Sequence, residues 1–192
     1  MPVENKKVFL EGEKIYFRGF ERGDLDGEYR NWINDTEVTH YIKVGTYPQT
    51  DDGLRAYFEK ELASANSVLF AVVEKESGKH IGNSHIYDID WVHRCALRAV
   101  VLGDKSCWGK GYALEVLQLL NQYAFEYLNL NKLISSTCSD NQAIQRLNEQ
   151  AGYTREGVGR QEFFRDGKYY DRVYWGMLKS EYMAQRKQDI TT

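Results

Sequence analysis

Hydrophobic residues recur along the chain with two different periods. Short apolar or alternating runs bounded by glycine, asparagine or aspartate are typical of strands, whereas apolar residues at every third or fourth position are typical of helices. This mixture of about seven strands and five helices predicts an α/β or α+β fold. The predicted strands are residues 14–20, 67–74, 80–90, 94–103, 132–138, 153–164 and 169–178. The predicted helices are residues 25–33, 36–42, 50–64, 109–128 and 139–151.

Turn and cap residues define the limits of several of these elements. Asp24 can cap the helix that follows it, and Ser139 begins a capping-box sequence of the form S-x-x-Q. Gly152 stands where helices commonly end, because glycine adopts a positive φ without strain. Between the last two strands, the pair Asp166-Gly167 is a strong signal for a tight hairpin.

Two of the predicted helices have an apolar stripe that can face a core. The stripe of the first helix consists of Leu54, Tyr57, Phe58 and Leu62. The stripe of the second, which we assign to the core rather than to a ligand site, consists of Ala113, Val116, Leu117, Leu120, Ala124, Tyr127 and Leu128.

The composition fits one globular domain. With 192 residues, of which 42% are hydrophobic and 14% aromatic, the chain is long enough to bury a core. The sequence contains no internal repeat, low-complexity tract or linker. We therefore predict a single domain over residues 1–192, with loose ends at residues 1–13 and 183–192.

Charge, cysteine content and hydropathy argue against several classes of protein. The net charge is −3 with basic and acidic residues interspersed, which argues against nucleic-acid binding. The three cysteines form no C-x-x-C and the four histidines have no metal-ligand spacing, so we predict neither a disulfide framework nor a metal site. Because no apolar run is long enough for a membrane span and the start lacks a signal-peptide core, we predict a cytoplasmic protein without a membrane partner.

Residues 98–115, RAVVLGDKSCWGKGYALE, combine a strand, a glycine-rich turn and the start of a helix. Gly109 and Gly111 let the backbone approach a ligand closely, and the first amides of a helix favour an anion. Lys110 adds a positive charge. The spacing fits neither a Walker A loop nor a Rossmann fingerprint. The stretch is therefore either a phosphate site of another kind or an ordinary connection between a strand and a helix.

The string WGKGYA at residues 108–113 resembles the central signature of the GNAT superfamily of N-acetyltransferases, Q/R-x-x-G-x-G/A, with Trp108 in the first place. It is especially similar to the branch that contains ribosomal-protein alanine and spermidine N-acetyltransferases. The string NQAIQRLNEQAGY at residues 141–153 is similar to the second GNAT signature. The stretch RGFERGDLD…WINDTEVT near the start resembles the N-terminal strand and split helix of the same branch. The resemblance extends over about residues 14–182.

This resemblance implies a single GNAT-like domain whose mixed, largely antiparallel central sheet is flanked by helices. It implies acetyl-CoA as co-substrate and no metal. In the family, successive amides of the glycine-rich turn bind the CoA pyrophosphate, and the preceding strand binds the pantetheine and the thioester oxygen. The cofactor-binding residues implied here are Val100, Val101, Leu102, Trp108, Gly109, Lys110, Gly111, Tyr112, Ala113, Asn141 and Asn148.

The chain departs from the family pattern at two positions that bear on catalysis. Relatives often have a glutamate in a string like R-A-E-L-G, where this chain has Leu97. Many also have a tyrosine near the leaving sulfur, where this chain has Asn148, which cannot act as a general acid. Glu162, in a Q-x-E-F context similar to that of the alanine acetyltransferases, is the first candidate for the base, and His85 is the second. The alternative is that both are structural residues.

We therefore hypothesise an N-acetyltransferase that transfers the acetyl group of acetyl-CoA to a primary amine by direct attack in a ternary complex. The acceptor would be a small amine, an amino sugar, a polyamine or a protein N-terminus, and the protein a monomer or homodimer. The alternative is a non-catalytic CoA-binding or regulatory module on the same fold, because a fold does not by itself determine a function.

Overall fold

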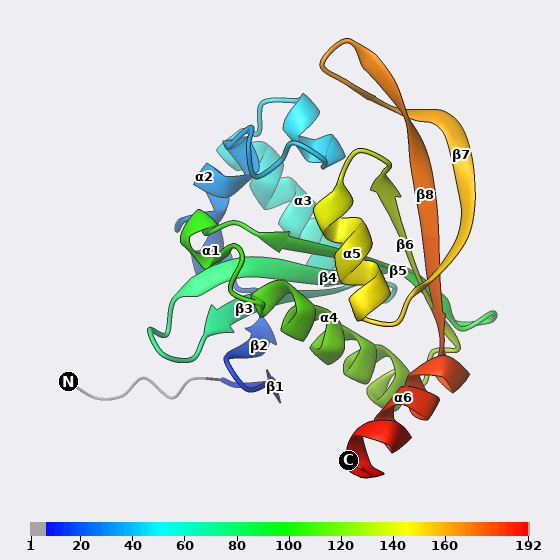
Figure 1. Ribbon diagram of the computed structural model, residues 1–192. Helices are drawn as coiled ribbons and strands as arrows, with labels where there is room; N and C mark the ends of the chain where they lie inside the picture. Colours follow the sequence, from blue (N-terminus) through cyan, green and yellow to red (C-terminus); the bar gives the residue numbers. More distant parts are fainter. Residues whose placement is uncertain (1–6, 192) are drawn as a thin grey trace. The chain divides into compact units, whose positions relative to one another are not determined.

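The computed structural model describes residues 7–191, and the side chains of residues 7–187 (Figure 1). Residues 1–6 and 192 of the predicted loose ends lie outside the described residues. The chain forms two compact units, of which the first comprises residues 1–85 and 100–119 and the second residues 86–99 and 120–192. The prediction of a single domain stays a prediction.

The fold is mixed α/β, as the sequence predicted, with eight strands in the described residues rather than about seven. The strands have the order β1-β2-β3-β4-β5-β6-β8-β7 in the sheet. Their bounds are Leu10–Glu11 (β1), Ile15–Gly19 (β2), Val68–Glu74 (β3), His80–Asp90 (β4), Cys95–Leu102 (β5), Lys132–Cys138 (β6), Thr154–Arg165 (β7) and Lys168–Leu178 (β8). Among the recorded registers, β5 with β6 is parallel and the others are antiparallel.

The described residues also contain six α-helices and three turns of 3-10 or π-helix. The α-helices are Arg22–Leu25 (α1), Tyr29–Asn34 (α2), Asp51–Ala63 (α3), Tyr112–Gln122 (α4), Gln142–Gln150 (α5) and Lys179–Thr191 (α6). The shorter turns are Lys43–Thr46 (η1), Lys105–Cys107 (η2) and Tyr123–Tyr127 (η3).

In the first unit, an apolar cluster joins the helices α1, α2 and α3 to strand β3. The cluster contains Phe20, Leu25, Tyr29, Trp32, Ile33, Leu54, Phe58 and Ala71, all of them buried. Thr50 caps α3 by accepting a hydrogen bond of 3.2 Å from the amide of Gly53, so the predicted start of this helix is confirmed. Of its predicted stripe, Leu54 and Phe58 are buried.

In the second unit, strand β8 pairs with β6 on one side and with β7 on the other. The β7–β8 hairpin extends beyond the end of β6 in Figure 1, and Asp166 and Gly167 form its turn with positive φ values of 49° and 75°. This confirms the hairpin predicted from the Asp-Gly pair. Trp175 of β8 is buried and donates a hydrogen bond of 3.1 Å to the hydroxyl of Thr137 on β6.

The helix predicted over residues 36–42 is wrong, because this segment forms a series of turns. The side chain of Asp35 accepts from the amide of Glu37 at 2.8 Å, and its carbonyl accepts from the amide of Thr39 at 2.9 Å. The bond to the side chain of Asp35 competes with helix formation, and the single helical bond from Thr39 is followed by the turn-type bonds of His40 and Ile42 to carbonyls three residues earlier. The helix predicted over residues 25–33 is interrupted at residues 26–28 and becomes α1 and α2.

Asp24 was predicted to cap this helix, but Glu21 holds the N-cap position. Asp24 lies three residues later and accepts from the amide of Glu21 at 2.8 Å. Its carboxylate also accepts two hydrogen bonds from Arg18, at 2.7 and 2.6 Å.

The helix predicted over residues 109–128 begins later, with α4 at Tyr112, and changes to a π-helical turn at Tyr123. The amide of Leu128 bonds to the carbonyl of Tyr123, five residues earlier. A π-turn shifts the phase of the helix by one residue, which places Phe125 in the core and leaves Tyr127 of the predicted stripe 57% exposed.

Two further details of the prediction are wrong. In the first unit, Tyr57 and Leu62 are exposed, and in the second, the N-cap of α5 is Asn141 rather than Ser139. Within the predicted loose ends, β1 pairs with β2, and the helix α6 runs to Thr191.

Candidate active site

The glycine-rich turn after β5 presents a row of free backbone amides. Gly109 and Gly111 have positive φ values of 74° and 86°, and a Cβ at either position would meet no atom within 4 Å. Within the described part of the chain, none of the amides of residues 109–113 donates to a protein acceptor. Open space, glycine backbone and unpartnered amides at the start of an 11-residue helix are the features that bind a phosphate group.

Side chains hold this turn in place. The indole N–H of Trp108 donates to the carbonyl of Leu102 at 2.9 Å, which ties the turn to the end of β5. The ammonium group of Lys105 lies 2.8 Å from both Asp35 and Glu37. These two carboxylates raise the pKa of Lys105 above its ordinary value, so the ion pairs persist at neutral pH.

Contacts within the first unit also hold the start of α4 in place. The hydroxyl of Tyr112 donates to the carboxylate of Glu74 on β3 at 2.6 Å, and this bond raises the pKa of Tyr112 to about 12. One carboxylate oxygen of Glu115 accepts from the amides of Lys14 and Ile15, at 2.8 and 3.3 Å. The first turn of α4 is therefore held by β2 and β3, and its amides point at a defined place.

Strand β5 reaches the turn through a tightly packed stretch. A Cβ on Gly82 of β4 would collide with the carbonyl of Val101, and a Cβ on Gly103 would collide with the ring of Trp32. Val100, Val101 and Leu102 are only partly buried. Both glycines permit a close approach that no other residue allows.

The paired region of strands β5 and β6 is short. Their parallel register consists of Cys95 with Lys132, Ala96 with Leu133, and Leu97 with Ile134. Both strands continue beyond this point, β5 to Leu102 and β6 to Cys138, but the described residues form no further pairs between them. The edge of β5 from residue 98 onward therefore has backbone groups that are not bonded to β6.

The two predicted residues of the second signature have different surroundings. The side chain of Asn141 accepts from the amide of Ile144 at 3.2 Å and so caps α5. Asn148 is fully buried on the inner face of α5, where its side-chain oxygen accepts a hydrogen bond from Arg98 of β5.

Glu162 lies in a bulge of the edge strand β7. The register with β8 shifts between Gly159 and Phe163, and within this interval Gln161 has a φ of 56° and donates to Asp171 at 3.0 Å. The carboxylate of Glu162 folds back over Gly159, where a Cβ would collide with it. The bulge therefore determines that the side chain of Glu162 lies over Gly159.

Two side chains of β8 contact the Glu162 carboxylate. Tyr174 donates a hydrogen bond from its hydroxyl, and the guanidinium of Arg172 lies 3.5 Å away. The bond to Glu162 raises the pKa of Tyr174.

Tyr174, which donates to the Glu162 carboxylate, lies on the same sheet face as Leu97, the position where relatives have a glutamate. Residues two apart on a strand share a face. Tyr174 therefore shares a face with Gly176, which pairs with Ile134, and Ile134 in turn pairs with Leu97.

His85, the second candidate base, is buried in the first unit. Its Nε2 lies 2.6 Å from the hydroxyl of Ser67 and 3.3 Å from the carboxylate of Glu61. Ser67 also donates to Glu61. The three side chains form a compact polar group, with His85 only 9% exposed.

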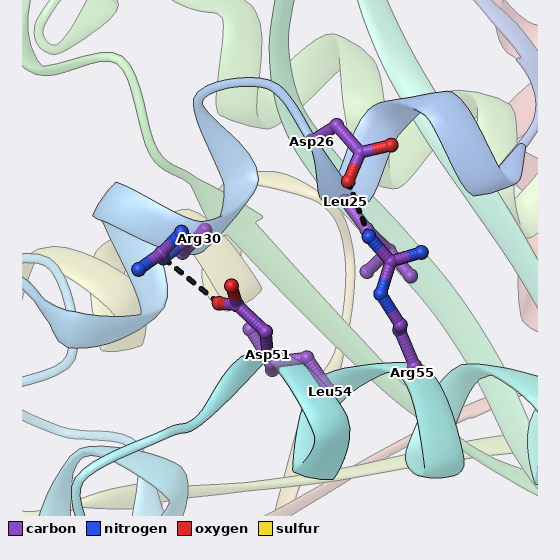
Figure 2. Close-up of a pocket in the computed structure, with 6 residues that line it drawn as sticks. All are labelled: Leu25, Asp26, Arg30, Asp51, Leu54 and Arg55. Carbon is purple, nitrogen blue, oxygen red and sulfur yellow. Dashed lines mark hydrogen bonds and ion pairs between the residues drawn. The ribbon is translucent and has the colours of Figure 1, made fainter.

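A surface pocket of the first unit lies between α1, α2 and α3 (Figure 2). Arg30 and Asp51 form an ion pair of 2.9 Å at its rim, and Arg55 and Asp26 form another of 2.6 Å. Each of the two arginines is paired with a carboxylate that also lines the pocket. The charged residues of the lining therefore cancel, and the lining has no net charge that would attract a charged ligand.

The described residues were compared with the requirements of a metal site and of a membrane-spanning helix. In residues 7–191, no three histidine, cysteine or acidic side chains are grouped to hold a metal ion. Over the same residues, no helix has both the length and the apolar composition of a membrane span.

The geometry adds residues that the sequence analysis did not single out as site residues. Tyr174 and Arg172 join Glu162, Ser67 and Glu61 join His85, and Arg98 joins Asn148. Only Arg98 had a visible signal, because an arginine within the apolar run ALRAVVL indicates a buried charge.

Comparison with known proteins assigns the fold and the family. Residues 14–154 match the acetyltransferase (GNAT) domain. The chain is 28% identical over 170 residues to the spermidine N(1)-acetyltransferase of Vibrio cholerae, covering 88% of this chain and 96% of that protein. It is 28% identical over 174 residues to the spermidine N(1)-acetyltransferase of Escherichia coli, covering 90% of each. The crystal structure of the Vibrio cholerae spermidine N-acetyltransferase with CoA and spermine superposes with a TM-score of 0.83 at 27% identity, covering 88% of this chain and 98% of that one.

Proposed function

The chain belongs to the GNAT acetyltransferase family, and we propose that it transfers the acetyl group of acetyl-CoA to a primary amine, with polyamines as the first acceptor class to test. The observation that carries this proposal is the row of unpartnered amides at residues 109–113, at the N-terminus of α4. Polyamines come first because two relatives are spermidine N-acetyltransferases. An amino sugar, another small amine and a protein N-terminus remain the other acceptors of the proposal.

In this proposal the turn binds the pyrophosphate of CoA. The amides of residues 109–113 donate to its oxygens, the dipole of α4 favours its negative charge, and Lys110 supplies a cation. Trp108 holds the turn through its bond to Leu102. The open edge of β5 at Val100 and Val101 offers backbone groups to the pantetheine arm and the thioester.

The reaction is a direct attack of the amine on the thioester. The lone pair of the amine nitrogen forms the new C–N bond, the C–S bond breaks with its electron pair remaining on sulfur, and the nitrogen loses a proton. Holding both reactants in this geometry removes several kcal/mol from the barrier. A base must accept the proton of the nitrogen.

We assign the base role to Glu162. Leu97 stands where relatives have a glutamate, and Tyr174, which donates to the Glu162 carboxylate, shares the sheet face of Leu97. His85 is the second candidate, but Ser67 and Glu61 already engage its Nε2 within a buried group. The geometry therefore favours Glu162, whose side chain is more exposed than that of His85.

Thiol release from acetyl-CoA, measured over a panel of amines, tests the proposed function. The panel contains spermidine, spermine, an amino sugar and a peptide with an N-terminal alanine. We expect release with at least one polyamine, together with the acetylated amine in a mass spectrum. CoA binding without thiol release on any amine would instead support the non-catalytic CoA-binding module.

A further inference from the structure

His80, the first residue of β4, is a histidine of the first unit that the proposed function does not use. Its Nε2 lies 2.9 Å from the carbonyl oxygen of Gly82. Because a carbonyl oxygen only accepts, Nε2 carries a proton and donates to it. The side chain is 14% exposed, and burial lowers the pKa of His80 against the opposing effect of the Asp24 charge. The ring is therefore neutral at pH 7, with its N–H bonded to Gly82.

Side chains of the N-terminal segment hold the imidazole ring of His80. The ring packs edge-to-face against Phe20 and Trp32, with ring centres 6.0 and 5.1 Å apart. Its Nδ1 lies 3.5 Å from the carboxylate of Asp24, which Arg18 fixes with two hydrogen bonds. These contacts come from several sides of the ring, so they determine the direction in which its N–H points.

The strand segment that accepts this bond lies directly against the end of β5. The carbonyl of Ile81 accepts from the amides of Gly103 and Asp104, at 3.0 and 3.1 Å. A Cβ on Gly82 would lie 2.3 Å from the carbonyl oxygen of Val101, so the two backbones touch with no room for a side chain. In such close packing, a displacement of β4 at Gly82 also displaces the end of β5.

Trp32 connects His80 with the end of β5 by a second route. One part of its indole packs on the imidazole, and a Cβ on Gly103 would collide with the same indole. Gly103 is followed by η2 and then by the glycine-rich turn. The position of Gly103 therefore helps to set where that turn begins.

We propose that His80 is a positioning residue for CoA, and that its hydrogen bond to Gly82 keeps the end of β5 where the glycine-rich turn can bind the cofactor. This inference rests on the proposed function. His80 acts through the backbone of β4 and contacts neither substrate. A neutral imidazole provides a directed donor without placing a charge in the apolar cluster that contains Phe20 and Trp32.

Three substitutions separate the hydrogen bond from the bulk of the ring. His80→Leu fills a similar volume but has no N–H. His80→Asn is polar, but its amide is too short to reach as far as Nε2, and it serves if the leucine variant does not fold. His80→Gln can place an N–H near the position of Nε2 and is the rescue variant. His93→Gln is the control, at an exposed histidine that pairs with Asp90 at 2.8 Å.

Titration calorimetry with CoA and hydrogen exchange measure the two expected consequences. The dissociation constant for CoA should rise about fivefold in His80→Leu and His80→Asn, the scale of one hydrogen bond. The amides of Gly103 and Asp104 should exchange faster in both variants. His80→Gln and His93→Gln should keep the wild-type affinity and exchange rates. In assays of thiol release, the loss should appear in the KM for acetyl-CoA, with turnover at saturating substrates unchanged.

The outcomes separate this inference from the proposed function. If the wild type binds CoA and the folded His80→Leu and His80→Asn proteins bind it equally well, His80 only stabilises the fold and the inference is wrong. If His80→Gln binds CoA as weakly as His80→Leu, the ring rather than its N–H is required, which also contradicts the inference. If the wild type binds no CoA, the proposed function fails first, and this inference fails with it.

Discussion

The indole N–H of Trp108 donates a 2.9 Å hydrogen bond to the backbone carbonyl of Leu102. This bond joins the residue immediately before the glycine pair to the last residue of β5. Because Trp108 is 41% exposed, burial alone does not hold its ring in place. The bond therefore helps to fix the direction in which the amides of the turn point.

Trp108→Phe tests this role. Phenylalanine keeps an aromatic ring but has no N–H, so the turn loses its bond to β5. We expect the dissociation constant for CoA to rise by a factor that corresponds to about 1 kcal/mol, the scale of one hydrogen bond. Urea unfolding should change by less than that, since the side chain is partly exposed. A CoA affinity equal to that of the wild type would show that the turn keeps its conformation without the indole.

Glu162→Gln tests the assignment of the base. The substitution keeps the shape of the side chain and removes its basicity, so turnover of the best amine should fall by about 10²-fold. The KM for acetyl-CoA should stay constant, because the proposed role is at the amine. Stopped-time assays of thiol release give both values.

The matched control for Glu162→Gln is Glu156→Gln. Glu156 is a carboxylate on the same strand and forms an ion pair of 2.7 Å with Lys132. The control variant should keep its turnover. Full activity in Glu162→Gln would assign Glu162 a structural role with Arg172 and Tyr174, and His85 would become the candidate base.

Asp24→Asn tests the electrostatics of the N-terminal segment. Burial raises the pKa of Asp24, but the hydrogen bonds from Arg18 and from the amide of Glu21, together with the charges of His80 and Arg18, lower it by more, so the net pKa is lowered. A lowered pKa stabilises the fold above the ordinary pKa of an aspartate, about 4, and this contribution disappears as the pH falls through the folded-state pKa.

We therefore expect Asp24→Asn to lower the free energy of unfolding by about 2 kcal/mol at pH 7. The difference from the wild type should shrink below about pH 4. Asp51→Asn, which removes an exposed ion pair with Arg30, is the control and should cost less than about 1 kcal/mol. Urea titrations at several pH values measure both. A difference for Asp24→Asn that does not depend on pH would contradict the electrostatic explanation.

Most of the regular elements could be predicted from local patterns. Strands β4 and β6 have the predicted bounds, and α3 starts at its predicted cap. These elements follow from periodicity and from short-range hydrogen bonds, which a sequence contains directly. The helix predicted over residues 36–42 failed because Asp35 bonds to the backbone that follows it and also pairs with Lys105, which is distant in sequence.

The candidate site was predictable only in part. The glycine-rich turn is a contiguous motif, so its residues could be named from sequence. The surroundings of Glu162 depend on a bulge in β7 and on the partners Arg172 and Tyr174 from β8, and no local pattern predicts that register. Likewise, the contact of Arg98 with Asn148 joins residues 50 positions apart.

The central claim is that the amides of residues 109–113 bind CoA, and substitution of Gly111 tests it most directly. Gly111→Val places a side chain in the open space of the turn at a φ of 86°, where a valine is strained. Gly167→Val is the matched control, because Gly167 has a φ of 75° and open space as well but lies in the β7–β8 hairpin. Titration calorimetry with CoA should show wild-type affinity in Gly167→Val and no measurable binding in Gly111→Val. A folded Gly111→Val protein that binds CoA as tightly as the wild type would contradict the claim.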